Sequence, residues 1–132
     1  MHSIRQALRE REKQVVVGLT VLRTTSPWVA KVYADAGADF VFVEHEHLFF
    51  NDTELSDLVL SCRLCGLPVM AKCSYVDRGS IAKLLDAGVT GIQLPMSESA
   101  QQLAEVVSHT QFPPLGRRAA EPRGKPERRM KR

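Results

Sequence analysis

The sequence predicts an α/β fold built around a parallel β-sheet. Apolar, β-branched stretches alternate with segments whose apolar residues recur at helical spacing. Several of the helical segments stop at a glycine, a common way to end a helix. The alternation repeats four times between residues 14 and 109. Strands that alternate with helices pair in parallel through right-handed crossovers, so one sheet of about four βα units is expected.

Local signals assign the first part of the chain. A short amphipathic helix at 3–13 precedes the first predicted strand, QVVVGLTVL at 14–22, which is rich in β-branched residues. Ser26 and Pro27 provide the cap and the first position of the next helix, because Pro is well tolerated there. Gly37 ends that helix.

The later units follow the same pattern. Strands are predicted at 40–46, 67–73 and 89–96, and helices at 54–65, 77–86 and 100–109. Two architectures accept four such units: an open doubly wound sheet, or half of a (β/α)₈ barrel, which takes about 250 residues. No GxGxxG motif follows the first strand, and this disfavours the nucleotide-binding open sheets.

Composition is that of an ordinary soluble domain. The 132 residues are 44% hydrophobic and 25% charged, and no apolar run approaches the roughly 18 residues of a membrane span. The first residues lack the apolar centre of a secretory signal, so a cytoplasmic protein is expected. Cys62 and Cys65 form a CxxC motif within a predicted helix. Since no second pair completes a zinc site, buried free thiols are expected there and at Cys73.

Basic charge is concentrated at the end of the sequence. Residues 117–132 carry eight Lys/Arg and two Glu, whereas the rest of the chain is mildly acidic. We therefore predict a folded part at 1–116 and a basic, disordered tail at 117–132. Because the rest of the chain is mildly acidic, the overall pI is a poor argument for nucleic-acid binding by the folded part, although the tail leaves open weak binding to RNA or to another anionic surface.

The predicted strand at 40–46 ends in ionisable residues: Glu44, His45, Glu46 and then His47. Each costs free energy to desolvate unless it has a partner, and the carboxyl ends of parallel strands are where ligands bind. We therefore predict an active-site edge here. Since residues two apart on a strand point the same way, His45 and His47 together offer an alternative site for Zn²⁺ or Mn²⁺.

Several segments, in unbroken order, resemble the HpcH/HpaI aldolases, which are class II, metal-dependent enzymes related to the citrate lyase β subunit. These segments are AGADFVFVEHEH, LPVMAK, IAKLLDAGVTGIQLPM and FPPLGRR. The resemblance implies the first half of a TIM barrel. It also implies cleavage or formation of a C–C bond in 4-hydroxy-2-oxo acids through a pyruvate enolate, with Mg²⁺, Mn²⁺ or Co²⁺ as cofactor.

The resemblance also implies roles for individual residues. His47 falls on the family's catalytic histidine and Glu46 on the carboxylate before it, while Glu44 falls where an Asp is usual and is expected to support the site. Lys72 stands where the family has an Arg that contacts the pyruvate carbonyl and enolate. Arg118 matches a Gly-x-Arg segment and is a candidate contact for a substrate carboxylate.

The resemblance also implies a limit on activity. The family's metal-binding carboxylates lie in the second half of the barrel, so metal ligands are expected to be missing and the aldolase to be truncated. The alternative is a catalytically inactive half-barrel. Four parallel strands leave two open edges that invite pairing, so a homo-oligomer is expected in either case.

Overall fold

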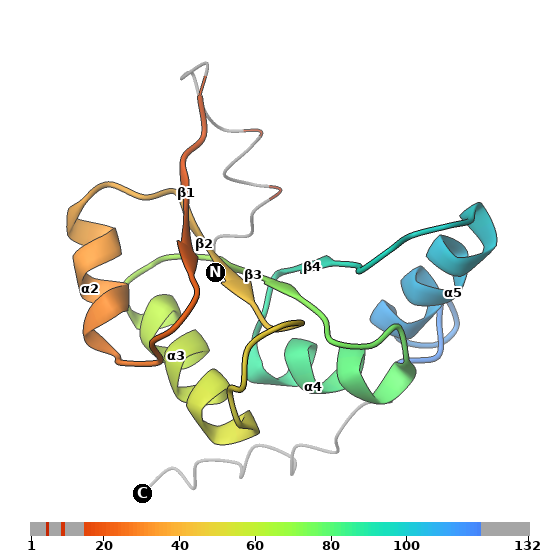
Figure 1. Ribbon diagram of the computed structural model, residues 1–132. Coiled ribbons are helices and arrows are strands. Elements are labelled where there is room, and N and C mark those ends of the chain that lie inside the picture. Colours follow the sequence, from red (N-terminus) through yellow and green to blue (C-terminus); the bar gives the residue numbers. More distant parts are fainter. Residues whose placement is uncertain (1–4, 6–8, 10–14, 120–132) are drawn as a thin grey trace, which may run out of the picture.

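The computed structural model describes residues 15–119 together with Arg5 and Arg9. Four strands form one sheet: β1 (Gly18–Val21), β2 (Phe40–Glu44), β3 (Val69–Lys72) and β4 (Gly91–Gln93) (Figure 1). The strands lie in chain order and every neighbouring pair is parallel, which confirms the predicted half of a barrel. The predicted helix at 3–13 and the tail beyond residue 119 lie almost entirely outside the described residues.

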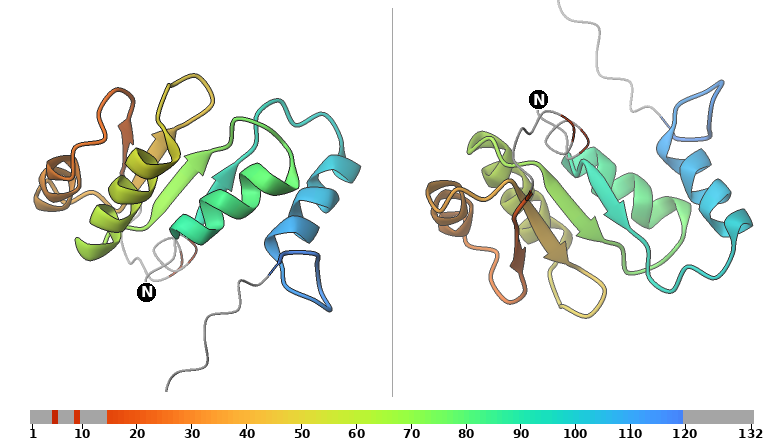
Figure 2. Two further views of the ribbon diagram at one scale, coloured as in Figure 1. Left: turned by 90° about the horizontal axis from the view of Figure 1, so that it is seen from below. Right: turned by 90° about the horizontal axis from the view of Figure 1, so that it is seen from above.

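Helices lie on one side of this sheet. They are α2 (Trp28–Asp35), α3 (Asp52–Leu64), α4 (Arg78–Ala87) and α5 (Ala100–Thr110). The two views in Figure 2 show α2, α3 and α4 covering a single face of the strands, while α5 lies beside α4 and beyond β4. None of the described helices is long and apolar enough to cross a membrane.

The helix starts follow local capping chemistry. Asn51 and Glu54 form a reciprocal capping box at the start of α3, and the Asp77 carboxylate accepts two backbone N–H groups at the start of α4. At α2 the prediction was one residue early: Pro27 is the N-cap and no side chain caps the helix. Ser26 instead contributes its carbonyl, which accepts the N–H of Val29 at 3.0 Å.

The core lies between the sheet and the helices. Val41 and Val43 of β2 and Val69 and Ala71 of β3 are fully buried against helical residues that include Leu58 of α3. Because side chains alternate along a strand, the intervening residues point to the opposite face. No described helix covers that opposite face, which is called the open face below (Figure 2).

The three cysteines are free thiols, as the sequence predicted. Cys62 and Cys73 are buried and Cys65 is partly buried. Burial raises the pKa of the Cys62 thiol to about 11, so this group is protonated at neutral pH. Nucleophilic and redox chemistry needs a thiolate, whereas the Cys62 thiol is protonated and packed in the core.

Candidate active site

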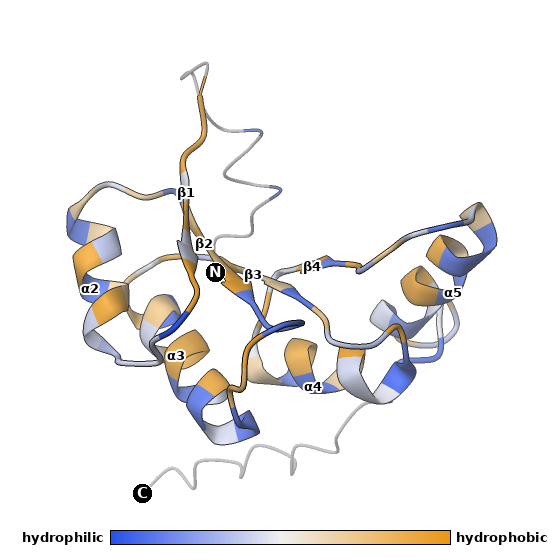
Figure 3. Cartoon of the chain, in the orientation of Figure 1, coloured by the Kyte–Doolittle hydropathy of each residue, from blue (hydrophilic) through white to orange (hydrophobic). Residues whose placement is uncertain are grey.

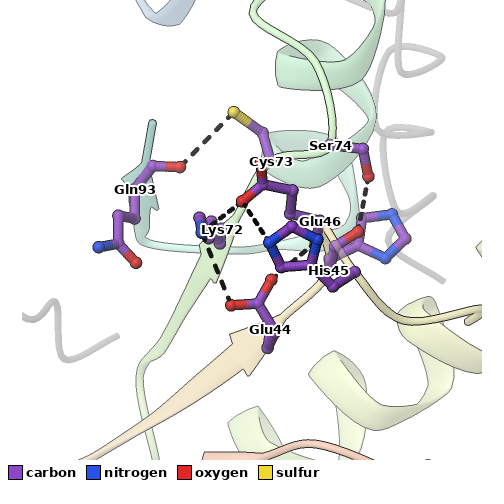
Figure 4. A network of polar contacts seen from close by, with 8 residues as sticks. Glu44, His45, Glu46, Lys72, Cys73, Ser74 and Gln93 are labelled. Carbon is purple, nitrogen blue, oxygen red and sulfur yellow. Dashed lines mark hydrogen bonds and ion pairs between the residues drawn. The ribbon is translucent and has the colours of Figure 1, made fainter. Parts of the chain in front are cut away.

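Polar side chains line up where the strands end. The strand register places Glu44 of β2 opposite Lys72 of β3, and Lys72 opposite Gln93 of β4. Figure 4 shows these three side chains on the same side of the sheet. Hydropathy along the chain changes from apolar to polar where β2 and β3 end (Figure 3). This is the carboxyl end of a parallel sheet, the end that carries active sites in barrels.

One carboxylate connects the two candidate catalytic side chains. The Lys72 ammonium forms an ion pair with Oε2 of Glu46 and lies 3.9 Å from Oε2 of Glu44. The His47 ring also reaches Glu46: its Nε2 is 3.3 Å from the same Oε2 atom. We call these four residues the Glu46 cluster. His47 and Lys72 therefore both contact the same carboxylate oxygen of Glu46.

Burial and charge divide the roles within the Glu46 cluster. The side chains of Lys72 and Glu46 are only 21% and 20% exposed, whereas that of His47 is 70% exposed. The hydrogen bond from Lys72 lowers the pKa of the Glu46 carboxyl, and the same bond raises the pKa of the Lys72 ammonium. Lys72 is therefore a fixed positive charge at neutral pH, next to an imidazole that solvent and ligand can reach.

The backbone bends sharply to bring these groups together. β2 ends at Glu44, two residues earlier than predicted, and residues 46–48 form a bend. The reason is local: the N–H of Glu46 donates to Oε1 of Glu44 at 3.0 Å, so it does not continue the strand ladder. The Ser74 hydroxyl donates to the His45 carbonyl at 2.6 Å and ties the bend to the end of β3. Glu44 thus shapes the bend that presents Glu46 and His47.

The structure does not bring His45 and His47 together as metal ligands. A His45–His47 site required a strand through both residues, and the strand ends before either of them. His45 instead lines a groove of about 500 Å³ between α3 and α4, together with Asp52, Ser74 and Lys83. In the described part of the chain, His45 belongs to no group of three metal-ligating side chains.

Arg118 pairs with residues that do not belong to the Glu46 cluster. Its guanidinium pairs with Asp86 at 2.7 Å and stacks over the Phe112 ring at 4.9 Å. Asp86 belongs to α4 and lines the same groove as His45 and Ser74. The Arg118–Asp86 pair anchors the segment after α5 to α4. A contact of Arg118 with a substrate carboxylate stays a prediction.

The Gly-x-Arg segment has a packing role in this position. A Cβ on Gly116 would overlap the carbonyl oxygens of Ser108 and Gln111, so only glycine fits. The N–H of Arg118 donates to the Gln111 carbonyl at 2.9 Å and holds the segment against the end of α5.

Sequence reasoning missed one residue at this edge. Gln93 is the last residue of β4, is exposed, and faces Lys72 across the strand pair (Figure 4). The predicted strand ran to residue 96, so Gln93 was not identified as the end of a strand. The available signal was its position: Glu44, Lys72 and Gln93 are the first polar residues to follow the apolar part of their strands on the open face.

The described residues contain one group that could hold a metal ion. Glu44, Glu46 and His47 each offer a ligand atom, and these atoms lie within 4.8 Å of one another. Carboxylates and imidazole suit a divalent cation. However, the Lys72 ammonium already forms an ion pair with Glu46 and lies 3.9 Å from Oε2 of Glu44, so it would compete with any metal for these carboxylates. As arranged, the group fits an ammonium ion pair and not a resident metal.

Comparison with known proteins supports a specific relationship, although no family model matches the sequence. The chain is 31% identical over 115 residues to a 2-keto-3-deoxy-L-rhamnonate aldolase of Salmonella typhi, and 29% identical over 114 residues to that of Salmonella gallinarum. In both cases the match covers 86% of this chain and 42% of the relative. The chain thus spans less than half the length of these curated relatives.

Solved structures give the same result. An HpcH/HpaI aldolase from Desulfitobacterium hafniense matches with a TM-score of 0.77 and 33% identity, over 80% of this chain and 41% of that one. Macrophomate synthase matches with a TM-score of 0.79 and 30% identity, over 91% of this chain and 42% of that one. Sequence and fold therefore agree that this chain is similar to the HpcH/HpaI aldolase of solved structure and to the curated aldolases, of each of which it covers less than half.

Proposed function

We propose that this chain carries part of the active site of an aldolase-type lyase that makes or breaks a C–C bond in 4-hydroxy-2-oxo acids. The observation that carries the proposal is the shared contact at Glu46, where His47 and Lys72 meet one carboxylate oxygen. A base and a fixed positive charge are what retro-aldol cleavage requires. The aldolase names of the relatives support the same class of reaction.

His47 is the proposed base. A neutral imidazole can accept a proton, and this ring is exposed to an incoming ligand. It accepts the proton of the substrate's 4-hydroxyl group as the C3–C4 bond breaks. The electron pair of that bond forms the enolate of pyruvate, and the 4-carbon leaves as an aldehyde. A proton then returns to C3 to give pyruvate, which balances the reaction.

Lys72 is the proposed contact for the enolate oxygen. Glu46 raises the pKa of Lys72, so this side chain stays an ammonium ion throughout the reaction. A Schiff-base mechanism needs a neutral amine as nucleophile, whereas charge stabilisation of an enolate needs a cation. We therefore assign Lys72 an electrostatic role. A lysine lacks the planar fork that an arginine would offer to a carboxylate and an enolate together.

A divalent metal, Mg²⁺, Mn²⁺ or Co²⁺, is implied by the family and would supply further stabilisation of an enolate when bound. The described residues do not fit it, because Lys72 holds the carboxylates of the only suitable group among them. We propose that the metal ligands of the complete enzyme come from outside the described residues. No step above depends on them.

Pyruvate release tests the proposal. The full chain is incubated with 4-hydroxy-2-oxo acids that carry either a second carboxylate or a sugar-acid chain, with and without Mn²⁺. We expect slow turnover that falls by about 10²-fold or more in His47→Ala and Lys72→Met. Lys83→Met is the matched control. The Lys83 ammonium lies 2.6 Å from Oδ2 of Asp52, and neither residue belongs to the Glu46 cluster. Turnover equal in wild type and His47→Ala would refute the proposal.

The second candidate is a catalytically inactive half-barrel that self-associates. The observation in its favour is structural: β1 and β4 each have a partner strand on one side only in the described part of the chain. A binding role for the basic tail remains a weaker hypothesis, since residues 120–132 lie outside the described residues. A cytoplasmic location also stays a prediction.

A further inference from the structure

The peptide unit that joins His45 to Glu46 is held on both sides by side chains. Its N–H, which belongs to Glu46, donates to Oε1 of Glu44 at 3.0 Å. Its carbonyl oxygen, which belongs to His45, accepts the hydroxyl of Ser74 at 2.6 Å. β2 ends at Glu44, so both groups lie beyond the strand and need partners from elsewhere. Because a peptide unit is planar, two bonds at its opposite sides fix its orientation.

Ser74 reaches this peptide unit from a fixed position. It follows Cys73, which is fully buried and donates its backbone N–H to the Gln93 carbonyl of β4 at 3.1 Å. The Cys73 thiol lies 3.5 Å from the same carbonyl oxygen. Lys72, the residue before Cys73, is the last residue of β3. The backbone of Ser74 is therefore anchored to the sheet on its amino-terminal side.

The end of β3 thus contacts the bend after β2 at two points (Figure 4). The Lys72 ammonium pairs with the side chain of Glu46, and the Ser74 hydroxyl bonds to the backbone directly before Glu46. The orientation of that peptide unit sets the direction in which the Glu46 side chain leaves the backbone. A change in this orientation would therefore move the carboxylate oxygen that Lys72 and His47 both contact.

We propose that Ser74 is a positioning residue for the Glu46 cluster: its hydroxyl fixes the peptide unit from which Glu46 projects, and so sets where the Glu46 carboxylate meets Lys72 and His47. Ser74 acts through the backbone, since its bond is to the His45 carbonyl. The chemistry required at this position is a short hydrogen-bond donor, so threonine can replace serine, whereas alanine and valine cannot. A contribution to catalysis rests on the proposed function, but the positioning itself is measurable without turnover.

A role in packing alone would give a different result. Ser74 also lines the groove between α3 and α4, together with His45. If Ser74 only filled the wall of that groove, its replacement would change the stability of the fold without changing the contacts of the Glu46 carboxylate. The decisive measurements are therefore made on Glu46 itself, and circular dichroism checks that each variant is folded.

Hydrogen exchange of the Glu46 amide, followed by NMR on the full chain, tests the first step. In Ser74→Ala this N–H is expected to exchange about fivefold faster, the factor that corresponds to one lost hydrogen bond, while amides within β2 keep their rates. Ser61→Ala is the matched control, because the Ser61 hydroxyl also donates to a backbone carbonyl, that of Asp57, at 2.7 Å within α3. Its Glu46 amide should exchange as in the wild type.

The titration of the Glu46 carboxyl, followed by its ¹³C chemical shift, tests the second step. The hydrogen bond from Lys72 lowers the pKa of this carboxyl. We expect the pKa to rise towards its ordinary value of 4.5 in Ser74→Ala and in Ser74→Val, and to stay low in Ser74→Thr, which has the shape of valine but keeps the hydroxyl. Lys72→Met gives the limit in which the ion pair is absent. Titration curves that are identical in wild type, Ser74→Ala and Ser74→Val would overturn the proposal, and so would an unchanged exchange rate of the Glu46 amide.

Turnover separates this proposal from the proposed function. If the wild type releases pyruvate, Ser74→Ala is expected to lower kcat about tenfold with KM within about twofold, because the reacting groups are misplaced while the ligand contacts remain. Ser74→Thr should restore most of the loss, and an unchanged kcat in Ser74→Ala would overturn the contribution to catalysis. If the wild type releases no pyruvate, the proposed function fails, whereas hydrogen exchange and titration of Glu46 still decide the role of Ser74.

Discussion

Removing the ammonium group from the Glu46 cluster is expected to create a metal site. In Lys72→Met the carboxylates of Glu44 and Glu46 lose a neighbouring cation. In the wild type this ammonium lies 3.9 Å from Oε2 of Glu44 and forms an ion pair with Glu46. The net charge of the two carboxylates and Lys72 changes from −1 to −2. The ligand atoms of Glu44, Glu46 and His47 already lie within 4.8 Å of one another. The electrostatic attraction between these groups and a divalent ion placed among the ligand atoms roughly doubles, because the net charge doubles. We therefore expect the dissociation constant for Mn²⁺ to fall on the order of tenfold.

Titration of Mn²⁺ by calorimetry, or by the electron paramagnetic resonance signal of free Mn²⁺, measures this change without any enzymatic assay. Lys83→Met controls for the loss of one positive charge elsewhere, because the partner of Lys83, Asp52, belongs to no three-ligand group among the described residues. His47→Ala in the Lys72→Met background should reverse the gain. Equal Mn²⁺ affinity in wild type and Lys72→Met would refute the argument that Lys72 occupies the place of a metal.

Three further outcomes are expected. The Glu46–Lys72 pair should stabilise the fold fully at neutral pH, because its carboxyl pKa is lowered below 4.5 and its ammonium pKa is raised above 10.5. The difference in unfolding free energy between wild type and Lys72→Met, measured with urea, should therefore shrink as the pH falls through the pKa of Glu46 or rises through the pKa of Lys72. A difference in unfolding free energy that is constant at all pH values would contradict this. Borohydride treatment with pyruvate should leave Lys72 unmodified by mass spectrometry, since it stays protonated, and a reduced pyruvyl adduct there would disprove the electrostatic role. Leu58→Ala should cost about 2–5 kcal/mol of unfolding free energy, because Leu58 is fully buried, whereas Leu64→Ala at an exposed position should change it by less than about 0.5 kcal/mol.

Periodicity along the chain determined which segments become strands and helices. Buried strands such as β2 and β3 need apolar residues on the helix-facing side, and helices such as α3 need an apolar stripe, so both patterns are visible locally. The parallel arrangement follows from the same alternation. The end of β2 was not predictable in this way, because it depends on a hydrogen bond from the N–H of Glu46 to the side chain of Glu44.

The composition of the candidate site was visible in the sequence, but its arrangement was decided by the tertiary structure. Glu44, Glu46 and His47 are close in the sequence and could be named together. Lys72 could be named only through a family resemblance. That Lys72 stands opposite Glu44, and Gln93 opposite Lys72, depends on strand register, which is set when the sheet packs on its helices. The pairing of Arg118 with Asp86 likewise depends on where the chain returns after α5. The physical reason is common to these cases: local pattern specifies which groups are polar, whereas distances between segments exist only once the core has formed.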